Sequence, residues 1–347
     1  MIMTRSEYFA LIAASVLIAG CFFASRFSRS GWGPEPIRAA VECRRGNAAD
    51  GRLSAGLCYR LLERFSEDSG KDIEIILTDS VSPDSLLCGY FDIVASPYGG
   101  MKDSGTVSIP VYSDSIAVFT IREDDRELKR RLESWTESYV SSKDFSHDTE
   151  VFLRRYNPLL KASLGGHTST LSPYDGIIRE YADSIGWDWK LLAAVIYKES
   201  QFRIEARSHR GAEGLMQMMP STARKWCDGD ISSPEESVKA GARYLESLSR
   251  RYRKLSANDL ERMKFTLAAY NAGEGRIRDV INYAGLRKVD TGYWDSVTTV
   301  IPEMRDSARM AATDTVRLGV FKGFETISYV KSVMAYYDAF NKIYIEQ

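Results

Sequence analysis

The feature that most constrains this 347-residue chain is a change of pattern at one polar, glycine-containing stretch, 161–172. Before it, short apolar segments typical of strands alternate with helical patterns, which favours an α/β domain. After it, apolar residues recur almost throughout at the three- and four-residue spacing of helices. We therefore predict two domains of different class. The length of the chain agrees with this number, since a domain has roughly 150 residues.

Composition excludes several kinds of protein. Hydrophobic residues make up 44% of the chain, which holds 14 Phe, 19 Tyr and 6 Trp, so it can bury a sizeable core. Its 46 Lys and Arg balance 47 Asp and Glu, whereas a dedicated nucleic-acid-binding protein normally has a basic excess. We expect no nucleic-acid partner. A multi-pass membrane protein is excluded because only one stretch is long and apolar enough to matter.

That stretch lies at the N-terminus and has the pattern of an export signal. Arg5 precedes an uncharged apolar run over 8–19, a length that suits the core of a signal peptide better than a membrane span. The run ends in Ile-Ala-Gly-Cys, which resembles a bacterial lipobox. We expect Cys21 to be the lipidation site, because acyl chains hold a protein firmly on a bilayer. A plain signal anchor extended through Ala24 is the alternative.

These patterns predict five segments. A lipoprotein signal peptide over 1–21 ends at the lipobox cysteine, and a tether over 22–36 is rich in Ser, Gly and Pro. A small α/β domain follows over 37–160. A linker over 161–171 then leads to a helical domain over 172–347.

Four further cysteines leave the redox state open. Export permits disulfides, but three of the four lie in the first half of the chain, so at most one pair forms there. Packing as small buried hydrophobic residues is the alternative for all of them: Cys43, Cys58, Cys88 and Cys227. No Cys-x-x-Cys pair and no Cys/His ligand spacing supports zinc, so we expect no metal site.

One helical pattern places a carboxyl group in apolar surroundings. In WDWKLLAAVIYKESQF, over Trp187–Phe202, Asp188 can cap a helix. Positions i, i+3, i+4 and i+7 of one face are Leu192, Val195, Ile196 and Glu199. Lost solvation and the C-terminal end of the helix dipole both raise the pKa of such a carboxyl. Glu199 is therefore a candidate general acid for glycosidic cleavage, with a solvated or ion-paired Glu as the alternative.

Further motifs follow in order. After Glu-Ser at 199–200 come Gly-Leu-Met-Gln at 214–217, Ala-Tyr-Asn-Ala-Gly at 269–273 and Glu-Thr-Ile-Ser-Tyr-Val at 325–330. This ordered set resembles the catalytic domain of the soluble lytic transglycosylase family (family 1), over roughly half of the chain. The resemblance implies an all-α, lysozyme-like fold for the second domain.

The resemblance also implies a role for each matching residue. Glu199 matches the single catalytic acid/base. Substrate-contacting positions are matched by Ser208, Met216, Gln217, Tyr270, Asn271 and Tyr329. Of these, Met216 would form an apolar wall of the groove, and Tyr329 would hydrogen-bond the catalytic carboxyl. Simple core packing of Met216 and a helix-ending role for Asn271 are the alternatives.

The reaction implied by the resemblance is non-hydrolytic cleavage of the MurNAc-β-1,4-GlcNAc bond of peptidoglycan strands, which leaves 1,6-anhydromuramoyl ends. It needs one carboxyl and no cofactor. A hydrolase usually needs a second carboxylate, and none of Glu205, Glu213 and Glu274 matches a position that the family uses in that way. Lysozyme-like hydrolysis and a glycan-binding scaffold without catalysis are the alternatives.

The first domain more faintly resembles one lobe of a family-3 periplasmic solute-binding protein. The resemblance rests on 56–65, 73–76, 87–92 and 109–112. Amino-acid-binding members carry an Arg where this chain offers only Lys102, and too few residues follow for a second lobe. We expect a docking or regulatory module for a cell-wall protein rather than an amino-acid sensor.

The pairing of these two domains resembles membrane-bound lytic transglycosylases. This resemblance implies a periplasm-facing protein of the cell envelope. Phe22, rather than Asp, follows the lipobox cysteine. By analogy with lipoprotein sorting, this favours a lipid anchor in the outer membrane.

Overall fold

The computed structural model of the chain describes residues 31–43, 53–112, 117–153 and 157–346. The chain divides into two compact units, Met1–Arg155 and Tyr156–Gln347. The predicted signal peptide, the lipidation site Cys21 and most of the predicted tether lie outside the described residues.

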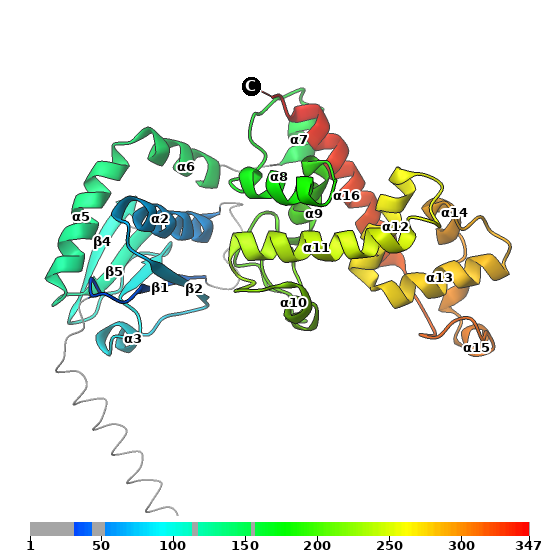
Figure 1. The fold of residues 1–347 in the computed structure, drawn as a ribbon, viewed down its shortest axis with the longest axis horizontal. Helices are drawn as coiled ribbons and strands as arrows, with labels where there is room; N and C mark the ends of the chain where they lie inside the picture. The colour runs from blue at the N-terminus through cyan, green and yellow to red at the C-terminus, as the bar shows by residue number, and fades with distance from the viewer. Residues whose placement is uncertain (1–30, 44–52, 113–116, 154–156, 347) are drawn as a thin grey trace, which may run out of the picture. The chain divides into compact units, whose positions relative to one another are not determined.

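The first unit is built on a five-stranded mixed sheet with strand order β2-β1-β3-β5-β4 (Figure 1). Strand β1 pairs in parallel with β2 and β3, whereas β5 pairs antiparallel with β3 and β4. The strands are β1 Ile37–Glu42, β2 Ile73–Thr78, β3 Ile93–Ser96, β4 Thr106–Tyr112 and β5 Ala117–Arg122. Every residue of β3 and β5 is buried, including the polar residues Ser96, Thr120 and Arg122.

Helices α2 and α3 pack on this sheet, and α5 and α6 complete the unit. Their bounds are α2 Ser54–Ser69, α3 Pro83–Leu87, α5 Arg126–Val140 and α6 Lys143–Leu153. The spacing of Leu57, Leu61, Leu62 and Phe65 predicts one apolar face for a helix over 54–69, and this face is buried, with the three leucines at 0% exposure and Phe65 at 1%. The alternation of strands and helices therefore confirms an α/β unit.

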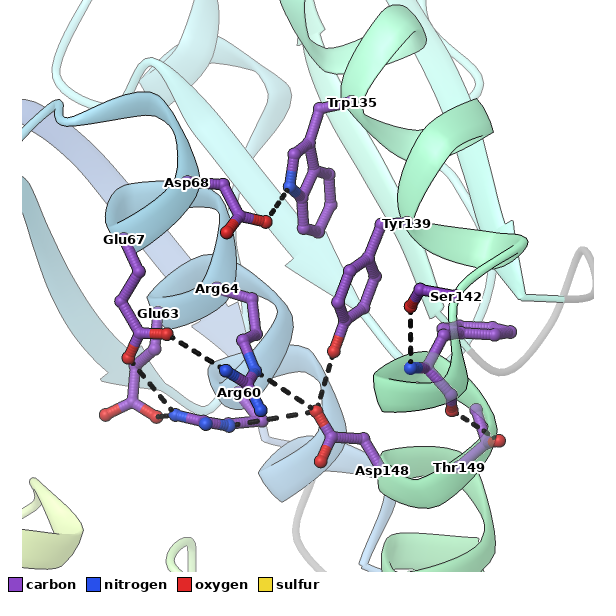
Figure 2. A network of polar contacts seen from close by, with 11 residues as sticks. Arg60, Glu63, Arg64, Glu67, Asp68, Trp135, Tyr139, Ser142, Asp148 and Thr149 are labelled. Carbon is purple, nitrogen blue, oxygen red and sulfur yellow. Dashed lines mark hydrogen bonds and ion pairs between the residues drawn. The ribbon is translucent and has the colours of Figure 1, made fainter.

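A network of polar contacts joins α2 to α5 and α6 (Figure 2). Asp148 of α6 is buried and accepts a 2.7 Å hydrogen bond from the Tyr139 hydroxyl. Its Oδ2 also lies 3.6 Å from Nε of Arg64 and 3.8 Å from Nε of Arg60. Trp135 stacks on the Tyr139 ring at a centroid distance of 4.8 Å. Since a buried carboxylate needs such partners, the network fixes how these helices meet.

The described residues of the second unit form helices and no sheet (Figure 1). The helices are α7 Pro158–Ser163, α8 Asp175–Ser184, α9 Trp189–Ser200, α10 Pro220–Trp226, α11 Pro234–Tyr252, α12 Asp259–Ala272, α13 Glu274–Leu286, α14 Trp294–Thr298, α15 Ser307–Ala311 and α16 Phe324–Ile343. Helix α9 packs against α8 and α16, and α12 also packs against α16. The chain as a whole is thus a mixed α/β protein with one small sheet.

The pair Ser172-Pro173 predicts a helix start with Ser172 as the cap, but α8 begins at Asp175. The carboxylate of Asp175 accepts hydrogen bonds from the main-chain N–H groups of Leu171 and Ser172, at 2.8 and 2.7 Å. These bonds hold the preceding residues in a turn, so the helix begins at Asp175. At α11 the sequence Ser-Pro-Glu-Glu over 233–236 predicts a capping box, and the Ser233 cap is confirmed, because its hydroxyl accepts a hydrogen bond from the N–H of Glu236.

The stretch expected as a linker is bonded within the second unit. Helix α7 already includes its first residues. The N–H of Thr168 then donates to the carbonyl of Ile343 at 2.7 Å, and the N–H of Ile345 donates back to Thr168 at 3.0 Å. The polar, glycine-containing composition therefore marks a connection that is tied to the last helix.

No disulfide joins any of the four cysteines that the structure describes. Cys43 and Cys58 are buried, as expected for small hydrophobic residues, and burial raises the pKa of the Cys58 thiol. Cys88 is exposed and Cys227 is half-buried, so packing in a core does not describe these two.

Candidate active site

The candidate site is built around the last turn of α9. Asp188 caps this helix, since its Oδ1 accepts a 2.9 Å hydrogen bond from the N–H of Lys190. The apolar face predicted from the sequence is fully buried, with 0% exposure at Leu192, Val195 and Ile196. Glu199 continues that face at the end of the helix, where its side chain is half-buried.

The Glu199 carboxyl has one close polar partner. The hydroxyl of Tyr329, a buried residue of α16, donates a 2.5 Å hydrogen bond to its Oε1. Burial raises the pKa of Glu199 from 4.5 to about 7, while the bond from Tyr329 and the charge of Lys198 act in the opposite direction. This carboxyl can therefore both give and take a proton near neutral pH.

Two tyrosines remain protonated beside this carboxyl. Burial, followed by the negative charge of Glu199, raises the pKa of both Tyr270 and Tyr329 well above 10. The Tyr270 hydroxyl donates a 2.7 Å hydrogen bond to the main-chain carbonyl of Met216. The motif residues of α12 and α16 thus converge on the carboxyl that α9 carries.

An unusual backbone ends α9 directly after Glu199. Gln201 and Phe202 are both left-handed, with φ of 55° and 63°. A bulky residue rarely adopts this conformation. Phe202 is nevertheless fixed there because its ring is buried 5.5 Å from that of Tyr197. Neither residue type signals such a turn, so this determinant of the Glu199 position was not found from sequence.

Ser208 and Gln217 shape the loop between α9 and α10. The Ser208 hydroxyl accepts a 3.0 Å hydrogen bond from the N–H of Ala212 and lies at an exposed position. Gln217 has a φ of 47°, and its side-chain amide donates to the carbonyls of Ala206 and Gly214, at 2.7 and 3.1 Å. Both side chains, which were expected to contact substrate, therefore bind the backbone of this loop.

Met216 lies in the core rather than on a surface. Its side chain is 0% exposed, and a Cβ added at Gly241 of α11 would lie 2.5 Å from its methyl group. The predicted apolar wall is therefore not formed by this side chain in the structure. Its carbonyl, which Tyr270 binds, is the group that faces the site.

Asn271 links two helices of the site. Its Oδ1 accepts a 2.9 Å hydrogen bond from the hydroxyl of Thr326, which is buried one turn before Tyr329 on α16. Asn271 therefore does more than end α12, although Gly273 follows it with a φ of 88°. Sequence reasoning assigned no role to Thr326, whose position inside the last motif was the available signal.

Glu205 is a half-buried carboxyl that follows Glu199 closely in the sequence. Burial raises its pKa, and its Oε2 accepts no hydrogen bond from any described residue. The described residues contain no group of three or more His, Cys, Asp or Glu side chains that could hold a metal ion.

One family model matches the part of the chain that contains this site. Residues 176–291 match the family model described as "Transglycosylase SLT domain". The match spans α8 to α13 and contains Glu199, Ser208, Gln217 and Tyr270. The resemblance to lytic transglycosylases, expected from the ordered motifs, is thus confirmed.

Curated relatives have one name in common. The chain is 29% identical over 243 residues to "Membrane-bound lytic murein transglycosylase F" of Desulfosudis oleivorans, covering 67% of this chain and 51% of the relative. It is 32% identical over 229 residues to the protein of that name in Aeromonas hydrophila, covering 66% and 42%. The chain thus spans about half of the length of these relatives, or less.

Two solved structures match part of this chain. The 70-kDa soluble lytic transglycosylase of Escherichia coli is 25% identical, with 50% of this chain and 24% of that chain covered and a TM-score of 0.34. The lytic transglycosylase Slt of Pseudomonas aeruginosa is 22% identical, with 62% and 33% covered and a TM-score of 0.35.

Proposed function

We propose that this chain is a peptidoglycan lytic transglycosylase that cleaves the MurNAc-β-1,4-GlcNAc bond and leaves 1,6-anhydromuramoyl ends. The observation that carries the proposal is the half-buried Glu199 carboxyl, which accepts a hydrogen bond from Tyr329 and has a pKa raised to about 7. The names of the relatives support the reaction class.

The reaction needs a single carboxyl that acts twice. Protonated Glu199 gives its proton to the glycosidic oxygen as the bond to the muramoyl carbon breaks. The N-acetyl carbonyl of the same sugar stabilises the cationic carbon. The Glu199 carboxylate then takes the proton of the muramoyl 6-hydroxyl, whose oxygen closes the anhydro ring. The proton lost in the first step is regained in the second, so no water is consumed.

The surrounding residues would position the strand. We assign Tyr329 to holding the carboxyl, and Tyr270, Asn271, Ser208 and Gln217 to contacts with the sugars next to the cleaved bond. Met216 would take part through its carbonyl, because its side chain is buried.

Lysozyme-like hydrolysis is the second candidate, and Glu205 is the observation that favours it. A second carboxyl is what a hydrolase uses to activate water or form a glycosyl intermediate. Glu205 is half-buried and its Oε2 has no hydrogen-bond partner among the described residues.

The masses of the reaction products distinguish the two candidates. Purified protein incubated with peptidoglycan strands should release muropeptides that are each one water lighter than the hydrolysis products. Products with ordinary reducing ends would show hydrolysis instead, and intact strands that remain bound would show a scaffold.

Replacing Tyr329 with Phe should change the pH dependence of cleavage. The hydroxyl lowers the pKa of Glu199, so its loss should move the high-pH decline of kcat/KM to higher pH. The rate at neutral pH should fall roughly tenfold, because the carboxyl loses its hydrogen bond. Tyr337→Phe is the matched control, since that hydroxyl binds Asp188 elsewhere on α16. A decline that stays in place or moves to lower pH would contradict the assignment.

We also propose that the protein is lipid-anchored at Cys21, in the outer membrane and facing the periplasm, and that the first unit docks a cell-wall protein. The support is the lipobox and the term "membrane-bound" in the relatives' names. Cys21→Ala should stop incorporation of a labelled lipid precursor and release the protein from the membrane fraction. Labelling that persists in this variant would exclude the lipobox.

A further inference from the structure

One segment of the second unit exposes apolar side chains that the proposed reaction does not use. Between α15 and α16, Leu318 is 53% exposed and Val320 40%, and Phe324, the first residue of α16, is 71% exposed. Arg317 and Lys322 of the same segment are exposed as well. We call residues 317–324 the apolar loop. Large apolar side chains gathered at a surface indicate an interaction site.

The fold holds the start of the apolar loop in one conformation. The buried carboxylate of Asp279 accepts hydrogen bonds from the N–H groups of Arg317 and Leu318, at 3.1 and 2.7 Å. The Arg276 guanidinium donates to the carbonyls of Leu318 and Gly319, at 2.9 and 3.0 Å. Two charged side chains of α13 thus bind backbone N–H and C=O groups of the apolar loop.

The end of the apolar loop is fixed in the same way. The N–H of Phe321 donates a 3.0 Å hydrogen bond to the carbonyl of Met304. Gly323 has a φ of 64°, and a Cβ there would lie 2.6 Å from Ile301. Because the backbone is anchored at both ends, exposure of Phe324 is a property of the folded unit rather than of a loose segment.

We propose that the apolar loop docks on an anionic lipid bilayer. Apolar side chains that flank basic ones suit the boundary between headgroups and acyl chains, where Arg317 and Lys322 would meet lipid phosphates. Within the described residues, no helix is both long and apolar enough to cross a membrane. This contact would therefore be peripheral. It is independent of glycan cleavage and of acylation at Cys21.

Co-sedimentation with vesicles tests the proposal. The chain from Phe22 onward keeps both compact units and cannot be acylated at Cys21. It should bind vesicles of phosphatidylglycerol and phosphatidylcholine more tightly than phosphatidylcholine alone. The triple change Leu318→Ser, Val320→Ser and Phe324→Ser should weaken binding about tenfold or more. Lys322→Gln should weaken it about fivefold, on anionic vesicles alone.

Leu286→Ser is the matched control, because Leu286 of α13 is 55% exposed outside the apolar loop. It should bind as the unchanged chain does. The proposal is overturned if the unchanged chain does not bind anionic vesicles, or if the control and the triple variant lose binding equally. Loss of cleavage of soluble strands with vesicle binding retained would show a substrate surface instead. We expect every variant to cleave soluble strands at the normal rate. Failure of the docking proposal can therefore be distinguished from failure of the proposed function.

Discussion

Replacing Glu199 with Gln is expected to lower the rate of glycan cleavage by about 10²- to 10⁴-fold. The amide keeps the size of the side chain and can still accept the bond from the Tyr329 hydroxyl. It can neither protonate the leaving oxygen nor remove a proton from the 6-hydroxyl. The rate of release of anhydromuropeptides measures the loss.

Two comparisons make this result specific. The far-ultraviolet circular dichroism of Glu199→Gln should match that of the unchanged protein, which shows that the loss is chemical. Glu205→Gln should keep activity if one carboxyl suffices. Cleavage by Glu199→Gln at the original rate would refute the assignment, and loss of activity in Glu205→Gln alone would favour the hydrolytic candidate.

The same Glu199→Gln change is expected to stabilise the protein above pH 7, by up to about 3 kcal/mol in the free energy of unfolding. The Glu199 carboxyl ionises near pH 4.5 when unfolded and near pH 7 when folded. Between these values the folded state binds more protons, so the stability of the unchanged protein falls as pH rises. The amide carries no charge and avoids this cost.

Urea unfolding at pH 4 and pH 8 measures the effect. The two proteins should have similar stability at pH 4, where the carboxyl is protonated in both states, and should differ at pH 8. Glu180→Gln, at an exposed position of α8, controls for the loss of a carboxylate in itself. A variant that is less stable than the original at pH 8 would contradict the burial argument.

Much of the fold follows from local patterns. Apolar spacing predicted α2 over 54–69, and its buried face is the predicted one. The start of α8 was predicted wrongly, because the Asp175 carboxylate binds the preceding backbone N–H groups. A local capping rule does not anticipate a side chain that folds back in this way.

The candidate site likewise depends partly on local sequence patterns and partly on contacts between distant segments. The periodicity of α9 is local, so it was enough to place Glu199 at the buried end of a helix. The burial of Met216 against Gly241 and the bond from Thr326 to Asn271 join segments far apart in the chain. Only packing between helices determines such contacts.

By itself, the sequence determined the two classes of domain, the order of the motifs and the carboxyl most suited to acid–base chemistry, because periodicity and motif spacing are properties of neighbouring residues. Only the tertiary structure decided how that carboxyl titrates. Its pKa of about 7 depends on desolvation by packed helices and on a hydroxyl that lies 130 residues further along the chain. Solvation is set by what surrounds a group in space.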